Sequence, residues 1–323
     1  MKAITFKNFG NSDVLEISEI EMPKFSADEV LIKVEGAGVN RPDIIQRLGL
    51  YPPPKGASKI LGLEVSGTIV EVGRNINKSF IGKEVCALLT GGGYAEYATC
   101  NISTVMPIPK GITILEACTI PETFFTVWTN LFDQGKLSYN ESLLIHGGAS
   151  GIGLTAISIA KALNIKCFAT VGSSEKKSFI DNLNIERCIN YKNEDFEKII
   201  KDNFSGVDVI LDMVGGDYFQ KNINILNKGG RLINIAYLKG SKVEVDLIQI
   251  MLKRLLISGS TLRVRSYEEK RKIADRLRER IWPLIENKSI KLFVDKKYDY
   301  HDVKDAHKYM ENNKNIGKIL LKF

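Results

Sequence analysis

A glycine-rich segment near the middle of the chain has the residue types and spacing of a nucleotide-binding turn. It reads His146-Gly147-Gly148-Ala149-Ser150-Gly151-Ile152-Gly153, so that the glycines at 148, 151 and 153 form a G-x-x-G-x-G pattern. Glycines let a backbone approach a pyrophosphate, and amide N–H groups at a helix N-terminus bind its negative charge. A plain glycine-rich connector has a similar composition, but the position between a predicted strand and a predicted helix favours a dinucleotide site.

The residues after the next predicted strand bear on which dinucleotide binds. A site for NAD usually places Asp or Glu there, about 20 residues after the glycines, to bind the ribose hydroxyl groups. This chain has two serines and two lysines instead, Ser173, Ser174, Lys176 and Lys177, and Glu175 falls inside the next predicted helix. An ordinary helix start explains the serines as N-cap residues but not the lysine pair. Because hydroxyl and ammonium groups suit a 2′-phosphate, the sequence predicts NADPH over NADH.

Two hydrophobic patterns divide the chain. Residues 1 to about 120 contain short alternating stretches bounded by glycine, such as 30–34 and 67–73, which are typical of a small β-barrel-like domain. From about residue 122 the pattern becomes strand, helix, strand, which predicts a parallel sheet covered on both faces. Its expected strands are 142–146, 166–171, 207–212 and 231–236. After a helix of about 267–287, we expect the terminal strand 318–323 to return to the first domain.

Charge and composition argue against several function classes. The net charge is +7, but the lysines are scattered and acidic residues accompany them. The one dense basic stretch, Arg263 to Arg280, alternates with Glu and Asp, which predicts the solvated face of a helix and not a nucleic-acid surface. No run approaches the roughly 18–20 apolar residues of a membrane span, and charges come too early for a signal peptide, so we expect a cytoplasmic protein. The five cysteines are widely spread without a C-x-x-C, which predicts buried, reduced thiols.

Longer strings along the chain carry a family resemblance. They are GVNRPD at 38–43, YPPP at 51–54, LGLEVSG at 61–67, GGGYAEY at 91–97, INYKNEDF at 189–196, HKYME at 307–311 and NKNIGK at 313–318. With these strings the chain resembles the zinc-free quinone oxidoreductase branch of the medium-chain dehydrogenase/reductase superfamily, and most closely its p53-inducible NADPH quinone oxidoreductase type. The resemblance implies an α/β protein with two domains. A GroES-like, β-rich catalytic domain would comprise 1–121 and 263–323, and a doubly wound Rossmann domain that binds NADPH would comprise 122–262.

The resemblance also implies a homodimer, a nicotinamide site in a cleft between the domains, and roles for individual residues. Asn40 and Thr126 would lie by the nicotinamide, whose pocket Asn234, Ala236, Thr261 and Leu262 would line. The turn from Gly148 through Ala149, Ser150, Gly151 and Ile152 to Gly153 would hold the pyrophosphate. Ser173, Lys177 and Tyr191 would enclose the 2′-phosphate.

The chain departs from zinc-bearing relatives at the positions of their metal ligands. Those relatives place Cys, and then His-Glu, where this chain has Asn40 and Leu63-Glu64, and they carry four closely spaced cysteines that are absent here. The three histidines, His146, His301 and His307, are interpreted as structural, so no metal site is expected.

The implied reaction is hydride transfer from NADPH to a quinone, with ortho-quinones as the expected acceptors. Because a quinone is already electrophilic, the protein need only orient the reactants in a dry pocket. Asn40 and Tyr51 are the catalytic candidates, and Tyr51, Tyr94 and Phe124 offer flat surfaces on which a planar ring could stack.

Two other interpretations stay open. One is an NADPH-dependent reductase of alkenal or enone double bonds, in which Tyr51 would donate the proton. The other is a non-catalytic relative that binds NADPH or RNA. The intact glycine pattern and Lys177 argue against the second.

Overall fold

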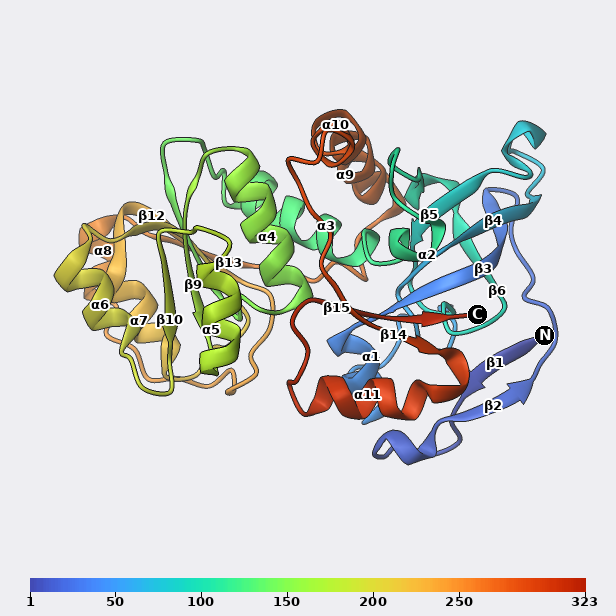
Figure 1. Ribbon diagram of the computed structural model, residues 1–323, viewed down its shortest axis with the longest axis horizontal. Coiled ribbons are helices and arrows are strands. Elements are labelled where there is room, and N and C mark those ends of the chain that lie inside the picture. The colour runs from blue at the N-terminus through green and yellow to red at the C-terminus, as the bar shows by residue number, and fades with distance from the viewer. The chain divides into compact units, whose positions relative to one another are not determined.

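The computed structural model describes all residues from 1 to 323 and divides into two compact units, drawn in Figure 1. Unit 1 comprises residues 1–125, 262–288 and 292–323, and unit 2 comprises residues 126–261 and 289–291. The sequence predicts domain boundaries after residues 121 and 262, whereas in the structure the boundaries between the two units fall after residues 125 and 261. Residues 289–291 belong to unit 2 because the Lys291 N–H donates to Ser158 Oγ at 3.0 Å.

Unit 2 is built on a six-stranded sheet in which all neighbouring strands are parallel, as the alternating pattern predicts. The strand order is β10-β9-β8-β11-β12-β13. The chain therefore moves outward from β8 and then returns to place β11 on its other side. Ligands of such sheets bind at this reversal, outside the carboxyl ends of the strands. The bounds are β8 Ser142–His146, β9 Lys166–Val171, β10 Arg187–Asn190, β11 Val207–Asp212, β12 Leu226–Asn234 and β13 Leu256–Gly259.

Five α-helices of unit 2 alternate with these strands (Figure 1). Helices α4 and α5 pack against β8, β9 and β10, while α7 and α8 pack against β12. Apolar side chains such as Leu144, Phe168 and Ile210 form a buried core, whose removal from water stabilises the unit. The bounds are α4 Gly151–Ala162, α5 Ser174–Asp181, α6 Phe196–Asn203, α7 Tyr218–Ile225 and α8 Ile248–Lys253, and a π-helix spans Trp128–Gln134.

Unit 1 is rich in β-structure. Its larger sheet has the order β14-β15-β3-β4-β5-β7, with β6 also paired to β3. The terminal strand pairs antiparallel with β3, Ile319 opposite Val39, so its expected return is confirmed. The bounds are β3 Glu29–Val39, β4 Glu64–Val72, β5 Glu84–Leu88, β6 Tyr97–Asn101, β7 Val105–Pro107, β14 Val294–Asp299 and β15 Lys318–Lys322, and a separate hairpin pairs β1 Lys2–Thr5 with β2 Glu16–Glu19.

The helix predicted at 267–287 is two helices. A capping box at Ser266 and Glu269 starts α9 (Tyr267–Arg280), and a second helix, α10 (Trp282–Glu286), follows with a proline in its first turn. Pro283 has no N–H to continue the helical hydrogen bonds. The remaining helices are α1 Arg41–Arg47, α2 Ile114–Ala117, α3 Pro121–Val127 and α11 Val303–Glu311, with 3-10 turns at Ser12–Val14, Lys78–Phe80, Ile102–Thr104 and Tyr300–Asp302.

Two predictions about composition can be compared with the fold. All five cysteines are free and buried, as predicted. None of the helices combines the length and apolar character that a membrane crossing needs.

Candidate functional site

The glycine turn lies between β8 and α4, at the carboxyl edge of the parallel sheet. Ser150 is the N-cap of α4, and its Oγ accepts the N–H of Gly153 at 3.0 Å. Gly147 has a φ of +76°, which only glycine adopts without strain, and its carbonyl accepts the Ser150 N–H at 2.9 Å. These bonds fold the segment into a tight turn that opens directly into the helix.

Two glycines of the turn are required by close approach. A Cβ on Gly153 would lie 2.3 Å from the carbonyl oxygen of Gly147, and a Cβ on Gly148 would lie 2.7 Å from the Cβ of Ala169. Because these two positions are glycine, the start of α4 packs closely against the ends of β8 and β9. Backbone N–H groups at such a helix start can bind a phosphate.

The predicted 2′-phosphate residues lie around the end of β9. Ser173 is the N-cap of α5, where its Oγ accepts the Lys176 N–H at 3.2 Å. Tyr191 follows β10, and a Cβ on Gly172 would be 2.3 Å from its hydroxyl, so the tyrosine tip lies beside the turn that leads into Ser173. Lys177 lies in the first turn of α5 and forms an ion pair with Asp181 at 2.7 Å. The hydroxyl groups of Ser173 and Tyr191 and the ammonium group of Lys177, which is paired with Asp181, thus lie at this edge.

Other residues predicted for the nicotinamide pocket have different surroundings. Asn234 ends β12 and is buried, yet neither its Oδ1 nor its Nδ2 has a hydrogen-bond partner. Ala236 is half-buried and Thr261 is exposed. Thr126 and Leu262 are both buried. Thr126 is the first residue of unit 2, and Leu262 is the first residue of the second segment of unit 1. The unsatisfied amide of Asn234 is the feature of this group that calls for a polar ligand.

In unit 1, three polar side chains that are far apart in sequence form one buried cluster. The Lys318 ammonium donates to Asn40 Oδ1 at 2.6 Å and to Glu64 Oε1 at 2.5 Å. The Asn40 amide donates to the same Glu64 oxygen at 2.9 Å. Gly38 leaves room for that carboxylate, because a Cβ there would lie 2.0 Å from it. Asn40 is therefore held in one orientation by a charged pair.

Two acidic side chains beside this cluster have raised pKa values. Burial raises the pKa of Asp43 to about 6, although the N–H groups of Gly62 and Asn40 bind its carboxylate. Burial, reinforced by the charge of Glu64, raises the pKa of Glu122 to about 8. The Glu122 backbone N–H donates to Glu64 Oε2 at 2.8 Å, which fixes the start of α3. Glu122 therefore carries a proton at neutral pH.

The interpretation of the basic stretch as a solvated face is wrong at two positions. Arg263 and Lys270 are buried, and the Lys270 ammonium donates to the Arg263 carbonyl at 2.9 Å. The Arg263 guanidinium lies over the Tyr51 ring, 5.4 Å from its centroid. Sequence reasoning missed Arg263, Lys270 and Glu122, because only the fold of unit 1 shows that Arg263 and Lys270 are buried and that Glu122 is partly buried beside Glu64. Arg263 precedes Ser266, the N-cap of α9, which was the one local signal that it lies outside the helix.

The aromatic residues expected to contact a substrate differ in accessibility. Tyr51 is half-buried in its proline-rich loop. Tyr94 and Phe124 are fully buried, and the Tyr94 hydroxyl donates to Asp43 Oδ2 at 3.3 Å. The prediction is therefore wrong for Tyr94 and Phe124, which are packing residues.

The histidines have structural surroundings. His146 is buried between Thr170 Oγ1 at 3.0 Å and Asn222 Oδ1 at 2.7 Å. Burial and the neighbouring Arg47 lower the pKa of His307 to about 3, while His301 is exposed. No three His, Cys, Asp or Glu side chains form a group that could hold a metal ion.

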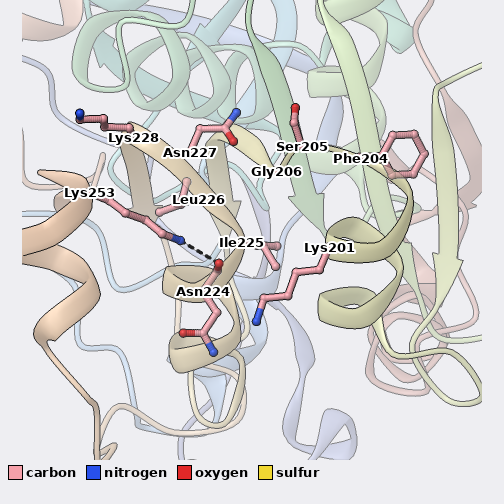
Figure 2. A pocket seen from close by; sticks show the side chains of 10 residues that line it. All are labelled: Lys201, Phe204, Ser205, Gly206, Asn224, Ile225, Leu226, Asn227, Lys228 and Lys253. Carbon is pink, nitrogen blue, oxygen red and sulfur yellow. Dashed lines mark hydrogen bonds between the residues drawn. The ribbon is translucent and has the colours of Figure 1, made fainter.

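A surface cavity of about 460 Å³ lies at the opposite edge of the unit 2 sheet (Figure 2). Its lining includes Gly206 and Leu226, which lie at the starts of β11 and β12, away from the glycine turn. The Lys253 ammonium there donates to the carbonyl of Asn224 at 2.8 Å, near the end of α7. A cation at a helix C-terminus is a stabilising arrangement, so Lys253 has a structural function.

Comparison with known proteins agrees with this arrangement. The alcohol dehydrogenase GroES-like domain family matches residues 26–110, and the zinc-binding dehydrogenase family matches residues 151–279. The quinone oxidoreductase of Lama guanicoe is 30% identical over 328 residues, which cover 99% of this chain and 97% of that protein. The chain belongs to the medium-chain dehydrogenase/reductase superfamily. The predicted fold class and the resemblance to quinone oxidoreductases are confirmed.

Solved structures of the superfamily extend the comparison. The Escherichia coli quinone oxidoreductase complexed with NADPH matches with a TM-score of 0.88 and 26% identity over 100% of both chains. The CurK enoyl reductase matches with a TM-score of 0.84 and 26% identity over 99% of this chain and 98% of that one. The chain is also 27% identical to part of a phenolphthiocerol/phthiocerol polyketide synthase of Mycobacterium tuberculosis, but it spans only 14% of the length of that synthase polypeptide. The closer likeness to the p53-inducible type stays a prediction.

Proposed function

We propose that this protein is an NADPH-dependent quinone oxidoreductase. The observation that carries the proposal is the strand–turn–helix unit from β8 to α4, in which Gly148 and Gly153 permit close approach and the helix start offers backbone N–H groups. Quinone oxidoreductases that align over nearly the full length of both chains support the choice of reaction.

The residues of unit 2 fit a dinucleotide with a 2′-phosphate. The start of α4 would hold the pyrophosphate, and Ser173, Tyr191 and Lys177 would surround the 2′-phosphate, where no acidic side chain takes the place of a ribose ligand. The unsatisfied amide of Asn234 would meet a polar group of the cofactor. When bound, NADPH supplies the hydride. The protein contributes binding, orientation and exclusion of water.

The test is NADPH oxidation with an ortho-quinone, a para-quinone and an alkenal as separate acceptors. We expect both quinones to be reduced and the alkenal to be reduced much more slowly. Turnover of the alkenal with no turnover of either quinone would overturn the proposal.

A second candidate, reduction of a conjugated double bond, is favoured by one feature of unit 1. Such a reaction needs a proton for the carbon next to the carbonyl group. Burial raises the pKa of Tyr51, and the pKa of Glu122 is about 8, so both side chains carry a proton at neutral pH. If Tyr51 is the donor, Tyr51→Phe should lower turnover of alkenals by about 10²–10⁴-fold and leave quinone reduction nearly unchanged. The likeness to the CurK enoyl reductase supports keeping this candidate.

A further inference from the structure

Arg263 has hydrogen-bonding capacity that the chain leaves unused. Only 6% of the residue is exposed. Its Nε donates to the carbonyl oxygen of Thr90 at 2.8 Å, which fixes the plane of the guanidinium. Its terminal nitrogens, Nη1 and Nη2, are buried and have no partner. Two neighbouring nitrogens therefore present free N–H groups in one plane.

This arrangement is unfavourable for the protein alone. More than about 90% of buried polar groups in folded proteins have a partner, and a buried cation without hydrogen bonds pays a large desolvation cost. The other buried cations of unit 1 have partners: Lys318 pairs with Glu64 and Asn40, Arg47 pairs with Glu311 and His307, and Lys270 donates to the Arg263 carbonyl oxygen. The exception at Arg263 indicates a group that binds a ligand.

The surroundings of the guanidinium define what that ligand can be. The Tyr51 ring lies against it at 5.4 Å and offers a flat apolar surface. The acidic groups that interact with Arg263 are the carboxyl groups of Asp43 and Glu122 and the hydroxyl of Tyr51, and of these Glu122 and Tyr51 carry a proton at neutral pH. Lys270 is the second cation of this region, and its pKa is lowered to about 8 by burial. A planar molecule with oxygen atoms at one edge fits these chemical properties.

The two terminal nitrogens of the guanidinium, which together form a planar fork of donors, favour a ligand whose two oxygen atoms are bonded to adjacent carbon atoms or to the same carbon. A guanidinium donates two parallel N–H bonds to paired oxygens, as in a carboxylate, whereas it meets a single carbonyl with half of that capacity. The two neighbouring carbonyl oxygens of an ortho-quinone form such a pair, and those of a para-quinone point in opposite directions. A carboxylate ligand would add a negative charge next to the carboxyl group of Asp43, whose pKa of about 6 leaves it mostly ionised at neutral pH, whereas a quinone is neutral when it binds.

We propose that Arg263 binds the acceptor, and that its Nη1 and Nη2 donate to the paired oxygens of an ortho-quinone whose ring lies near Tyr51. This assignment rests on the proposed function and names the residue that sets its substrate preference. Hydride transfer converts the ortho-quinone into a catechol monoanion, as NADPH becomes NADP⁺, and one proton then completes the catechol. The fixed guanidinium would stabilise the negative charge as it develops on the oxygens.

The direct test is binding of a diol product analogue to the protein without cofactor. The probes are a naphthalene diol with neighbouring hydroxyl groups, its isomer with hydroxyl groups at opposite ends, and benzoate, each titrated by calorimetry. We expect the wild-type protein to bind the neighbouring diol about tenfold or more tightly than the isomer or benzoate. Arg263→Gln should abolish this preference, and Arg263→Lys should lose most of it, because an ammonium keeps the charge without the fork. Arg265→Gln is the matched control and should keep it.

Three further measurements on Arg263→Gln distinguish loss of acceptor binding from loss of folding or of cofactor binding. Arg263→Gln should melt at the wild-type temperature or above, since it removes an unsatisfied buried cation, and its Kd for NADPH should stay within about twofold. With an ortho-quinone, its KM should rise about tenfold or more while KM for a para-quinone changes less. Equal binding of the two diols by the wild type, tighter binding of benzoate, or a large rise in the NADPH Kd of Arg263→Gln would overturn the assignment. A wild type that reduces no quinone would instead refute the proposed function.

Discussion

Single residues in unit 1 show how buried charge is organised around Asn40. Lys318 and Glu64 form a buried ion pair, and both contact the Asn40 amide. Removing one partner of such a pair typically destabilises a protein by about 3–5 kcal/mol, because it leaves the other charge buried. The pair thus fixes Asn40 strongly, and a rigid amide is suited to orienting a bound group.

Lys177 is the residue that most directly tests cofactor choice. A charge-assisted bond to a 2′-phosphate contributes about 1.5–3 kcal/mol, or roughly a tenfold to hundredfold preference for NADPH over NADH. Lys177→Glu should abolish most of this preference and leave the Kd for NADH nearly unchanged, as measured by fluorescence titration. Lys201→Glu is the control, since Lys201 also forms an i,i+4 pair but lies by the opposite sheet edge (Figure 2). Equal affinities of the wild type for the two cofactors would contradict the prediction.

Glu122 should make stability depend on pH. Its pKa rises from 4.5 to about 8 in the folded protein, so the folded state holds a proton that the unfolded chain releases. This contribution is fully present below about pH 4.5 and is lost as the pH rises through 8. The melting temperature of the wild type should therefore fall between pH 5 and 9 relative to that of Glu122→Gln. Glu175 is exposed, so the melting temperature of Glu175→Gln should change with pH as that of the wild type does. If the melting temperatures of the wild type, Glu122→Gln and Glu175→Gln all changed in parallel with pH, the raised pKa of Glu122 would be refuted.

The sequence predicted the functions of residues whose partners are close in sequence better than those of residues whose partners are far away in sequence. Gly153, Ser150 and Ser173 were identified because their function depends on neighbours within one turn. Lys318 and Glu64 are separated by 254 positions, and no pattern in the sequence pairs them. Arg263 was misassigned because a basic residue next to an amphipathic helix has the composition of a solvated surface, whatever covers it.

At the scale of elements, the turn before α4 is the most constrained junction of unit 2. Strand periodicity and glycine spacing predicted it correctly, whereas the break of the 267–287 helix was missed because Pro283 lies in the first turn of a new helix, where proline is tolerated. The turn combines a positive φ at Gly147 with the contact of Gly153 against two carbonyl groups.

Gly153→Ala should open this turn. The new Cβ would overlap the carbonyl oxygens of Gly147 and Gly148, at 2.3 and 2.6 Å, so the helix start must move away from the strand ends. Overpacking of this kind costs about 1–3 kcal/mol. We expect a lower melting temperature and a Kd for NADPH raised by about tenfold or more, with a native circular dichroism spectrum at low temperature. Unchanged NADPH affinity would show that the cofactor binds elsewhere.

At the scale of the whole molecule, the parallel sheet of unit 2 ends at β13, an edge strand. Leu256 and Ile257 on this strand are 50% and 37% exposed, and α8 adds exposed apolar residues. Leu255, just before the strand, is apolar and would suit an interface, but it packs against the unit's own core. An open edge with apolar side chains favours pairing with a second copy across a two-fold axis.

The predicted homodimer can be tested at this edge. Light scattering should give twice the 36.1 kDa of one chain at micromolar concentration. Ile257→Lys should shift the mass toward that of one chain, because pairing would bury the new charge. Ile81→Lys, at a position 47% exposed in unit 1, should leave the mass unchanged. A wild type with the mass of a single chain would contradict the dimer.

The central claim, hydride transfer from NADPH to a quinone, is tested most directly by competition in one vessel. An ortho-quinone and an alkenal at equal concentrations are mixed with limiting NADPH and the protein, and the products are separated and quantified by mass spectrometry. We expect nearly all of the NADPH consumed to appear as catechol, with little saturated aldehyde. Saturated aldehyde as the main product, with the ortho-quinone left unreduced, would contradict the account.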